Sequence, residues 1–231
     1  FHTHFAISII HSFEERFEID FKGEKQNYKT VFLPSMLTHK LHSPGSVLIV
    51  QIDPDYAEFL PLENFSKTSP TEIKELELLD ENFIGMECST AKQFVINLIH
   101  KIGKKSLRPQ IKIDYRIKNS LDYLKKLEEI PSKLPIESLA KRVNLSSERF
   151  RHLFSEEVGM NFRRYLLWLR IRKAGESLKS GFTLTDAAHN AGFTDSAHFS
   201  KVFKENFGIS PSKIFGSNQT EVNFCDIFLD R

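Results

Sequence analysis

Two short runs near the C-terminus place polar side chains on one face of a predicted helix. These faces carry Glu148, Arg151 and His152 in the first run and Ala197, Ser200 and Lys201 in the second. Arginine, lysine, serine and histidine can hydrogen-bond to base edges or phosphates, a carboxylate can accept from the cytosine amino group, and alanine can contact a thymine methyl. These residue types suit a helix that reads nucleic acid. The alternative is a solvated face of an ordinary helical bundle.

The helices that would position these side chains belong to an internal repeat. Leu145–Tyr165 returns as Thr194–Ile214, with matching residues 49 positions apart. Just before each run, Asn144 or Gly192 stands where a helix must end, and both residue types tolerate the left-handed backbone of such a turn. Residues that can cap a helix follow in both copies. The sequence therefore predicts two helix-turn-helix units.

A long helix is predicted between the two units, from Phe162 to Lys179. One side of it is apolar, including Tyr165 and Trp168, and the rest is basic, so it can pack on both units. At ~1.5 Å per residue this helix spans roughly 27 Å. The bodies of the two units add the remainder of the about 34–36 Å that separates successive major grooves on one face of DNA.

Charge is distributed unevenly along the chain. Residues 111–215 carry 19 Lys or Arg against 12 Asp or Glu, a net charge of +7, although the whole chain carries only +2. Residues 1–110 carry a net charge of −3. A basic domain inside a near-neutral chain is typical of a part that contacts phosphate, which favours nucleic-acid binding over an inert bundle.

The C-terminal hundred residues resemble the AraC/XylS family of bacterial transcription regulators, from about Ile113 to Phe215. Six segments carry the resemblance: Leu139-Ala140, Leu145-Ser146, Tyr165–Leu178, Ala187-Ala188, Ala191-Gly192-Phe193, and the run Ser196–Lys204 that closes on Gly208–Pro211. In that family, two helix-turn-helix units are joined by a long helix. The sequence departs from the family at His152, where many members carry Arg, and at Ile214-Phe215, which replaces a Tyr-Arg pair.

The resemblance implies which side chains face the major groove. They are Glu148, Arg151, His152, Asp195, Ser196, Ala197, Ser200 and Lys201. Asp195 has an equal claim to be a helix cap. Because the two reading faces differ, one chain is expected to recognise an asymmetric, non-palindromic site.

The function that the resemblance implies is sequence-specific DNA binding and regulation of transcription, with no enzymatic activity. The expected partner is double-stranded DNA. A small-molecule effector, a homodimer and, for an activator, RNA polymerase are left open. A non-specific architectural DNA-binding protein is an alternative, and it predicts equal affinity for all duplexes at matched salt. No run reaches the ~20 apolar residues of a membrane span, and a cytoplasmic location is expected.

The N-terminal part has a different pattern. Short runs rich in Phe, Ile and Val alternate with turn residues and predict antiparallel strands at Phe5–Phe13, Phe17–Phe21, Tyr28–Leu33 and Ser46–Ile52. The stretches His2–Ala6 and Pro34–His39 resemble the degenerate cupin-type sensory barrel that precedes the DNA-binding domain in many members of the family. The residues that would bind a ligand are unknown.

Imidazoles in this region raise an enzyme hypothesis. His2 and His4 would point to the same face of a strand, and His39 or His42 could join them at a metal ion. The Glu that active cupins place a few residues after the paired His is absent, since Ala6, Ser8 and Ile9 fill that region. The sequence therefore favours no metal and no cofactor over the alternative, a metal-dependent cupin enzyme with a DNA-binding tail.

The expected fold class is an α+β multidomain chain. Residues 1–66 form a small antiparallel β-barrel-like domain of the degenerate cupin kind, and residues 67–110 a helical connector that offers dimerisation and a hinge. Residues 111–215 form an all-α domain with the two helix-turn-helix units, and residues 216–231 a tail. This division follows the shifts in composition along the chain.

Within the connector, a helix start is predicted at Thr68–Thr71 with Glu72 following. The helix Ser89–Gly103 carries an apolar stripe that must pack on the barrel or on a second copy of the chain. Lys104–Gln110 is the candidate hinge. Cys88 and Cys225 are far apart in the sequence, and their spacing indicates neither a zinc site nor a disulfide framework.

Overall fold

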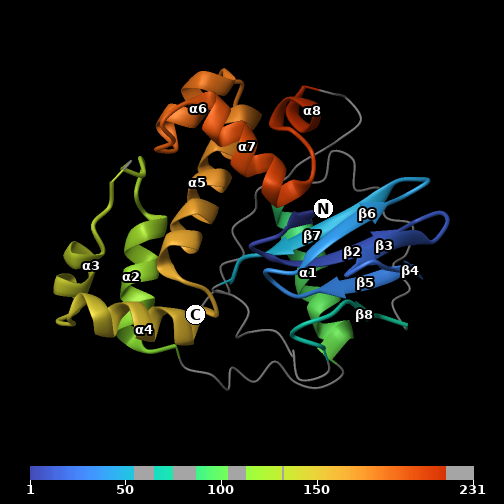
Figure 1. Ribbon diagram of the computed structural model, residues 1–231, viewed down its shortest axis with the longest axis horizontal. Coiled ribbons are helices and arrows are strands. Elements are labelled where there is room, and N and C mark those ends of the chain that lie inside the picture. The colour runs from blue at the N-terminus through green and yellow to red at the C-terminus, as the bar shows by residue number, and fades with distance from the viewer. Residues whose placement is uncertain (55–64, 75–86, 104–112, 132, 217–231) are drawn as a thin grey trace.

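The computed structural model describes residues 1–54, 65–74, 87–103, 113–131 and 133–216. Its N-terminal part consists of antiparallel strands and its C-terminal part of helices, as the sequence predicts (Figure 1). Among the described residues, no helix combines the length and apolar character needed to cross a membrane.

The N-terminal part contains two four-stranded antiparallel sheets, ordered β1-β6-β3-β4 and β7-β2-β5-β8. The strands are β1 (His2–Thr3), β2 (Ile7–Ser12), β3 (Phe17–Phe21), β4 (Glu24–Tyr28), β5 (Thr30–Leu33), β6 (Thr38–His42), β7 (Val47–Ile52) and β8 (Thr71–Glu72). Four of these match the runs expected from the sequence. The additional strands β1, β4, β6 and β8 are short or polar.

Apolar side chains fill two cores in this part. One core lies between the sheets and includes Ile10 of β2, Phe17 and Ile19 of β3 and Val31 of β5. The other lies on the outer face of the β7-β2-β5-β8 sheet and is covered by α1 (Cys88–Gly103), which contributes Leu98 (Figure 1). The apolar stripe of this helix therefore packs on its own β-domain.

Two expectations for the connector are wrong. Thr71 and Glu72 do not start a helix but form β8, because they pair with Phe32 and Val31 of β5. Cys88 is disulfide-bonded, contrary to the expectation from its spacing, and its partner lies outside the described residues. The candidate hinge, Lys104–Gln110, also lies outside them.

The C-terminal part contains seven helices among the described residues. They are α2 (Tyr115–Lys125), α3 (Ile136–Arg142), α4 (Ser147–Val158), α5 (Phe162–Lys179), α6 (Leu184–Asn190), α7 (Ser196–Phe207) and α8 (Pro211–Phe215). The bounds of α5 coincide with the predicted linking helix. Helices α3 and α4 form the first helix-turn-helix unit, and α6 and α7 form the second.

Each helix-turn-helix unit has its own core, and α5 takes part in both. Phe150 and Phe154 of α4 pack with Tyr165 in the first core. Phe199 and Phe203 of α7 pack with Ile171 in the second. The duplicated Phe pairs thus hold equivalent places, and α5 fixes the two units relative to each other.

Candidate nucleic-acid interface

The first reading helix, α4, is fixed at both ends by local sequence. Its N-cap Ser146 accepts a hydrogen bond from the backbone N–H of Arg149 at 3.2 Å. Its C-cap Gly159 has the left-handed backbone angle φ of 74°. The turn before it is made by Asn144, which is also left-handed at φ 55°. The apolar face is buried, so the polar face must point outward.

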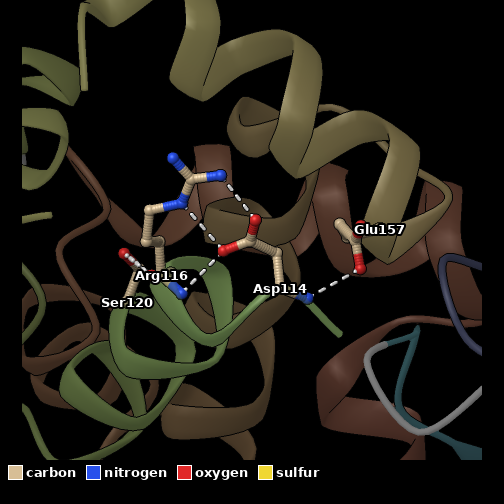
Figure 2. Close-up of polar contacts among 4 residues, drawn as sticks. All are labelled: Asp114, Arg116, Ser120 and Glu157. Atoms are coloured by element: carbon tan, nitrogen blue, oxygen red, sulfur yellow. Dashed lines mark hydrogen bonds and ion pairs between the residues drawn. The ribbon is translucent and has the colours of Figure 1, made fainter. Parts of the chain in front are cut away.

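A second contact network ties the start of α2 to α4 (Figure 2). Asp114 caps α2 by accepting from the backbone N–H of Arg116, and it also pairs with the Arg116 guanidinium at 2.6 Å. The backbone N–H of Asp114 in turn donates to the Glu157 carboxylate at 3.0 Å. The Arg116 hydrogen bond lowers the pKa of Asp114 to about 2. The carboxylate of Asp114 therefore holds the start of α2, while its backbone N–H links that start to α4.

The second reading helix, α7, has the same kinds of N-cap, C-cap and preceding turn as α4, made by different residues. Its N-cap is Asp195, whose carboxylate accepts from the His198 backbone N–H at 2.7 Å. This hydrogen bond is the main cause that lowers the pKa of Asp195. Gly208 ends the helix at φ 78°, and Gly192 makes the preceding turn at φ 79°. Asp195 is thus a helix cap, and a contact between it and DNA stays a prediction.

The side chains predicted to read the groove lie on the surface of α4 and α7. Those of Glu148, Arg151, His152, Asp195, Ala197 and Lys201 are exposed, and those of Ser196 and Ser200 are half-buried. Arg151 forms an ion pair with Glu137 at 3.6 Å, with both side chains more than half exposed. Such an exposed pair contributes little, so Arg151 remains available to another anion.

The two reading helices lie at opposite ends of α5 (Figure 1). Further exposed basic groups that the sequence analysis did not single out stand beside them. They are Arg149 at the start of α4, Arg163 and Arg164 at the start of α5, and Lys204 on α7. Arg149, Arg163 and Arg164 lie in the first turns of their helices, where a sequence search for cations would find them, whereas Lys204 lies in the last turn of α7.

The β-domain contacts the linking helix through one carboxylate. Asp53, directly after β7, accepts a hydrogen bond from the indole Nε1–H of Trp168 at 2.9 Å. Its other oxygen pairs with the Arg172 guanidinium, and the side chains of Asp53 and Arg172 are only 11% and 16% exposed. This contact joins residues more than a hundred positions apart, and no local sequence pattern predicts it.

The β-domain also contacts both helical cores and the end of α7. Phe5 packs against the core of each helix-turn-helix unit. The ring of His4 lies 6.4 Å from that of Phe207. His2, His4 and His39 cluster beside this contact, whereas His42 is exposed and lies outside the cluster. Among the His, Cys, Asp and Glu side chains of the described residues, these three imidazoles form the group that is close enough together to hold a metal ion.

The fold and this surface define a β-domain followed by a double helix-turn-helix domain. Residues 139–216 match the family model described as "Helix-turn-helix domain". The helix-turn-helix domain of the chain is therefore similar to those of the AraC/XylS family of regulators.

Curated relatives are similar over part of the chain. The Msm operon regulatory protein of Streptococcus mutans is 23% identical over 161 residues, which cover 68% of this chain and 54% of the relative. The HTH-type transcriptional activator RhaR of Pectobacterium atrosepticum is 40% identical over 77 residues, which cover 33% of this chain and 27% of the relative. The aligned part thus spans about half, or less, of these curated relatives.

Similarity over nearly the whole chain is found with a solved structure of another protein. This structure is that of unsaturated fatty acid bound ToxT from Vibrio cholerae, with a TM-score of 0.56 and 15% identity. The match covers 96% of this chain and 92% of ToxT. At this identity the likeness shows the fold alone, a β-domain followed by two helix-turn-helix units.

Proposed function

We propose that this chain is a sequence-specific DNA-binding regulator of transcription that inserts α4 and α7 into two successive major grooves. The observation that carries the proposal is the pair of exposed polar faces on α4 and α7, each helix held by its own core. The two helices lie at opposite ends of α5 (Figure 1). The net charge of +7 on residues 111–215 supports contact with phosphate.

The two reading faces would recognise different half-sites. α4 offers a carboxylate, a guanidinium and an imidazole, whereas α7 offers two hydroxyls, a methyl group and an ammonium group. A single chain whose two reading helices carry different side chains requires an asymmetric DNA site. The same inequality argues against an architectural protein, for which no particular base would be needed.

Regulation would pass through the β-domain, because it contacts α5 at Trp168 and α7 at Phe207. The proposal includes a small-molecule effector. ToxT, solved with an unsaturated fatty acid bound, is an example of a bound small molecule in another protein of this fold. A homodimer and a contact with RNA polymerase belong to the same proposal. The proposed role is not enzymatic and is placed in the cytoplasm, in keeping with the family of the C-terminal domain.

Selection of preferred sites from random duplexes tests the proposal directly. The expected result is one enriched, non-palindromic motif with two blocks about one helical turn apart. Footprinting of the monomer on that motif should protect two successive turns on one face. Equal recovery of all duplexes at matched salt, or protection of one turn only, would contradict the proposal.

Single substitutions then test each reading helix. We expect Arg151→Ala and Lys201→Ala each to weaken binding to the selected duplex by about tenfold or more, since a lost base contact costs about 1–3 kcal/mol. Each should also relax the preference in one block only. Lys25→Ala is the control, because it removes the same charge from the exposed β3–β4 hairpin of the other domain. A control that weakens binding equally would show that only net charge matters.

A further inference from the structure

Three imidazoles from two neighbouring strands meet at the contact between the β-domain and the second helix-turn-helix unit. His2 of β1 and His39 of β6 are direct cross-strand partners, and His4 follows β1 on the same face as His2. The three ring centroids lie 4.4–4.8 Å apart in every pairing. One ring nitrogen from each residue lies within 4.8 Å of the other two.

The hydrogen bonds around the cluster leave the Nε2 atoms facing one another. His39 donates from Nδ1 to the Leu37 carbonyl at 3.0 Å, so its Nε2 carries the lone pair. That Nε2 is buried and has no hydrogen-bond partner among the described residues. His4 contacts the Ser8 hydroxyl through Nδ1 at 2.7 Å and directs Nε2 at the Nε2 of His2, 2.8 Å away. Metal-binding histidines are oriented in this way, with the second nitrogen held by an oxygen.

The protonation state of the rings also suits a ligand. Burial lowers the pKa of His39 and holds that of His4 well below its ordinary value, and burial together with His39 lowers the pKa of His2 to about 4. Neutral imidazole is the form that binds a metal ion. A buried, unpaired Nε2 costs free energy, which an ion at the centre of the cluster would recover.

We propose that His2, His4 and His39 bind one divalent transition-metal ion of the zinc, nickel or copper class. Imidazole nitrogens suit these ions. Ligands about 2.0–2.1 Å from such an ion stand roughly 3.3 Å apart in a tetrahedral arrangement, so small rotations of the rings complete the site. Three protein ligands leave a coordination position open. The preference for no metal that the sequence suggests rested on the missing Glu, and this geometry does not require it.

The site lies against the end of the second reading helix, and this part of the inference rests on the proposed function. A Cβ built on Gly208, the C-cap of α7, would lie 2.8 Å from Nδ1 of His2. The carbonyl end of a helix carries partial negative charge, which favours a cation nearby. Phe207 contacts both His4 and Trp168. An ion that fixes the three rings therefore also fixes the surface on which the C-terminal end of α7 packs. Metal binding is in this way coupled to the position of α7.

Metal binding is tested on the full chain, purified without a histidine tag and stripped with a chelator. Titration with Zn²⁺, and separately with Ni²⁺ and Cu²⁺, is followed by calorimetry and by the fluorescence of Trp168, the single tryptophan. We expect one equivalent of ion per chain and a change in fluorescence. His39→Ala and the half-buried His2→Ala should each weaken binding by tenfold or more, while the exposed His42→Ala should stay within twofold. Absence of saturable binding, or equal binding by His2→Ala, would overturn the site.

Coupling is tested with the selected duplex. Its affinity for wild-type protein and His42→Ala should change at least threefold between excess Zn²⁺ and excess chelator, and its affinity for His2→Ala should not change. Unchanged affinity in the wild type, with ion uptake intact, would overturn the coupling. A protein that takes up the ion but binds no duplex under either condition would overturn the proposed DNA binding and leave the metal site standing.

Discussion

At the level of single residues, short polar side chains decide where four helices of the C-terminal part begin. Ser146, Asn161, Thr183 and Asp195 each accept a hydrogen bond from a backbone N–H in the first turn of the helix that follows. These N–H groups have no partner within the helix, so each cap satisfies a donor that would otherwise be exposed or unpaired. Asp114 plays the same part for α2 and in addition reaches Arg116 and, through its backbone, Glu157.

Asp114 gives a prediction about stability and pH. Asp114→Ala should lower the free energy of unfolding by about 1 kcal/mol at neutral pH, the usual cost of a lost N-cap. Because the folded-state pKa of Asp114, about 2, lies below its ordinary value of 3.8, the stability from its charge is present above pH ~4 and is lost as the pH falls towards 2. Asp114→Asn keeps a capping side chain without the charge. Its deficit relative to wild type should shrink between pH 5 and pH 3 in urea unfolding, and a deficit that grows would contradict this account.

At the level of elements, the turn inside each helix-turn-helix unit is the sharpest constraint. Both turns use one left-handed residue, Asn144 in the first unit and Gly192 in the second. The surroundings differ, however. A Cβ added at Gly192 would collide with the carbonyl oxygen of Ile130, in the segment between α2 and α3. The second turn therefore needs glycine for space as well as for backbone angle.

The matched pair Gly192→Ala and Asn144→Gly tests this difference. We expect Gly192→Ala to destabilise the chain by roughly 2 kcal/mol or more, since the left-handed conformation costs ~1–2 kcal/mol for a residue with a Cβ and the collision adds to it. Asn144→Gly should change stability by less than about 1 kcal/mol, because relieved backbone strain offsets the added freedom of the unfolded chain. Thermal and urea unfolding measure both. A loss for Gly192→Ala that stays within the ~1–2 kcal/mol of the left-handed backbone alone would show that the contact with Ile130 is unimportant.

The elements that the sequence predicts well are those whose signals are local. The predicted bounds of α5 coincide with the observed ones, and the structure adds that Asn161 caps the helix. β3 was predicted in the same way from its alternating Phe and Ile. β4 was missed because its first four residues are polar and exposed, and only the tight turn at Lys22 and Gly23 pairs it with β3. β8 was missed because Thr71 and Glu72 follow a proline, a pattern typical of a helix start, whereas pairing with β5 decides their structure.

The candidate sites can be divided in the same way, into those with local sequence signals and those that depend on distant contacts. The outward faces of α4 and α7 follow from helical periodicity, so their residues could be named from the sequence. The imidazoles of His2 and His4 could be paired from their spacing, but the choice of His39 over His42 depends on the register between β1 and β6. The contact of Asp53 with Trp168 depends on how two domains meet, which no periodicity records.

At the level of the whole molecule, the β-domain is joined to the helices at several points. Phe5 packs on both helical cores, Asp53 pairs with α5, and His2 and His4 lie beside the end of α7. The β-domain therefore contacts both units that would read DNA, and a ligand that altered its surface would act on their placement. Such coupling requires that the contacts between the β-domain and the helices hold the two domains together as one unit.

Substitution of Asp53 tests that linkage. Asp53→Ala removes the acceptor of the Trp168 indole N–H and the partner of Arg172, both within a poorly exposed contact. We expect a loss of about 2 kcal/mol, the cost of hydrogen bonds to a charged group. Because the lost contact joins the domains, the helical part should then unfold separately from the β-domain, giving two transitions in place of one. Trp168 should become more accessible to acrylamide and its emission should shift to longer wavelength. Glu24→Ala, which removes an exposed carboxylate from β4, is the control and should leave one transition. If Asp53→Ala also keeps one transition and a shielded Trp168, this carboxylate does not hold the domains together.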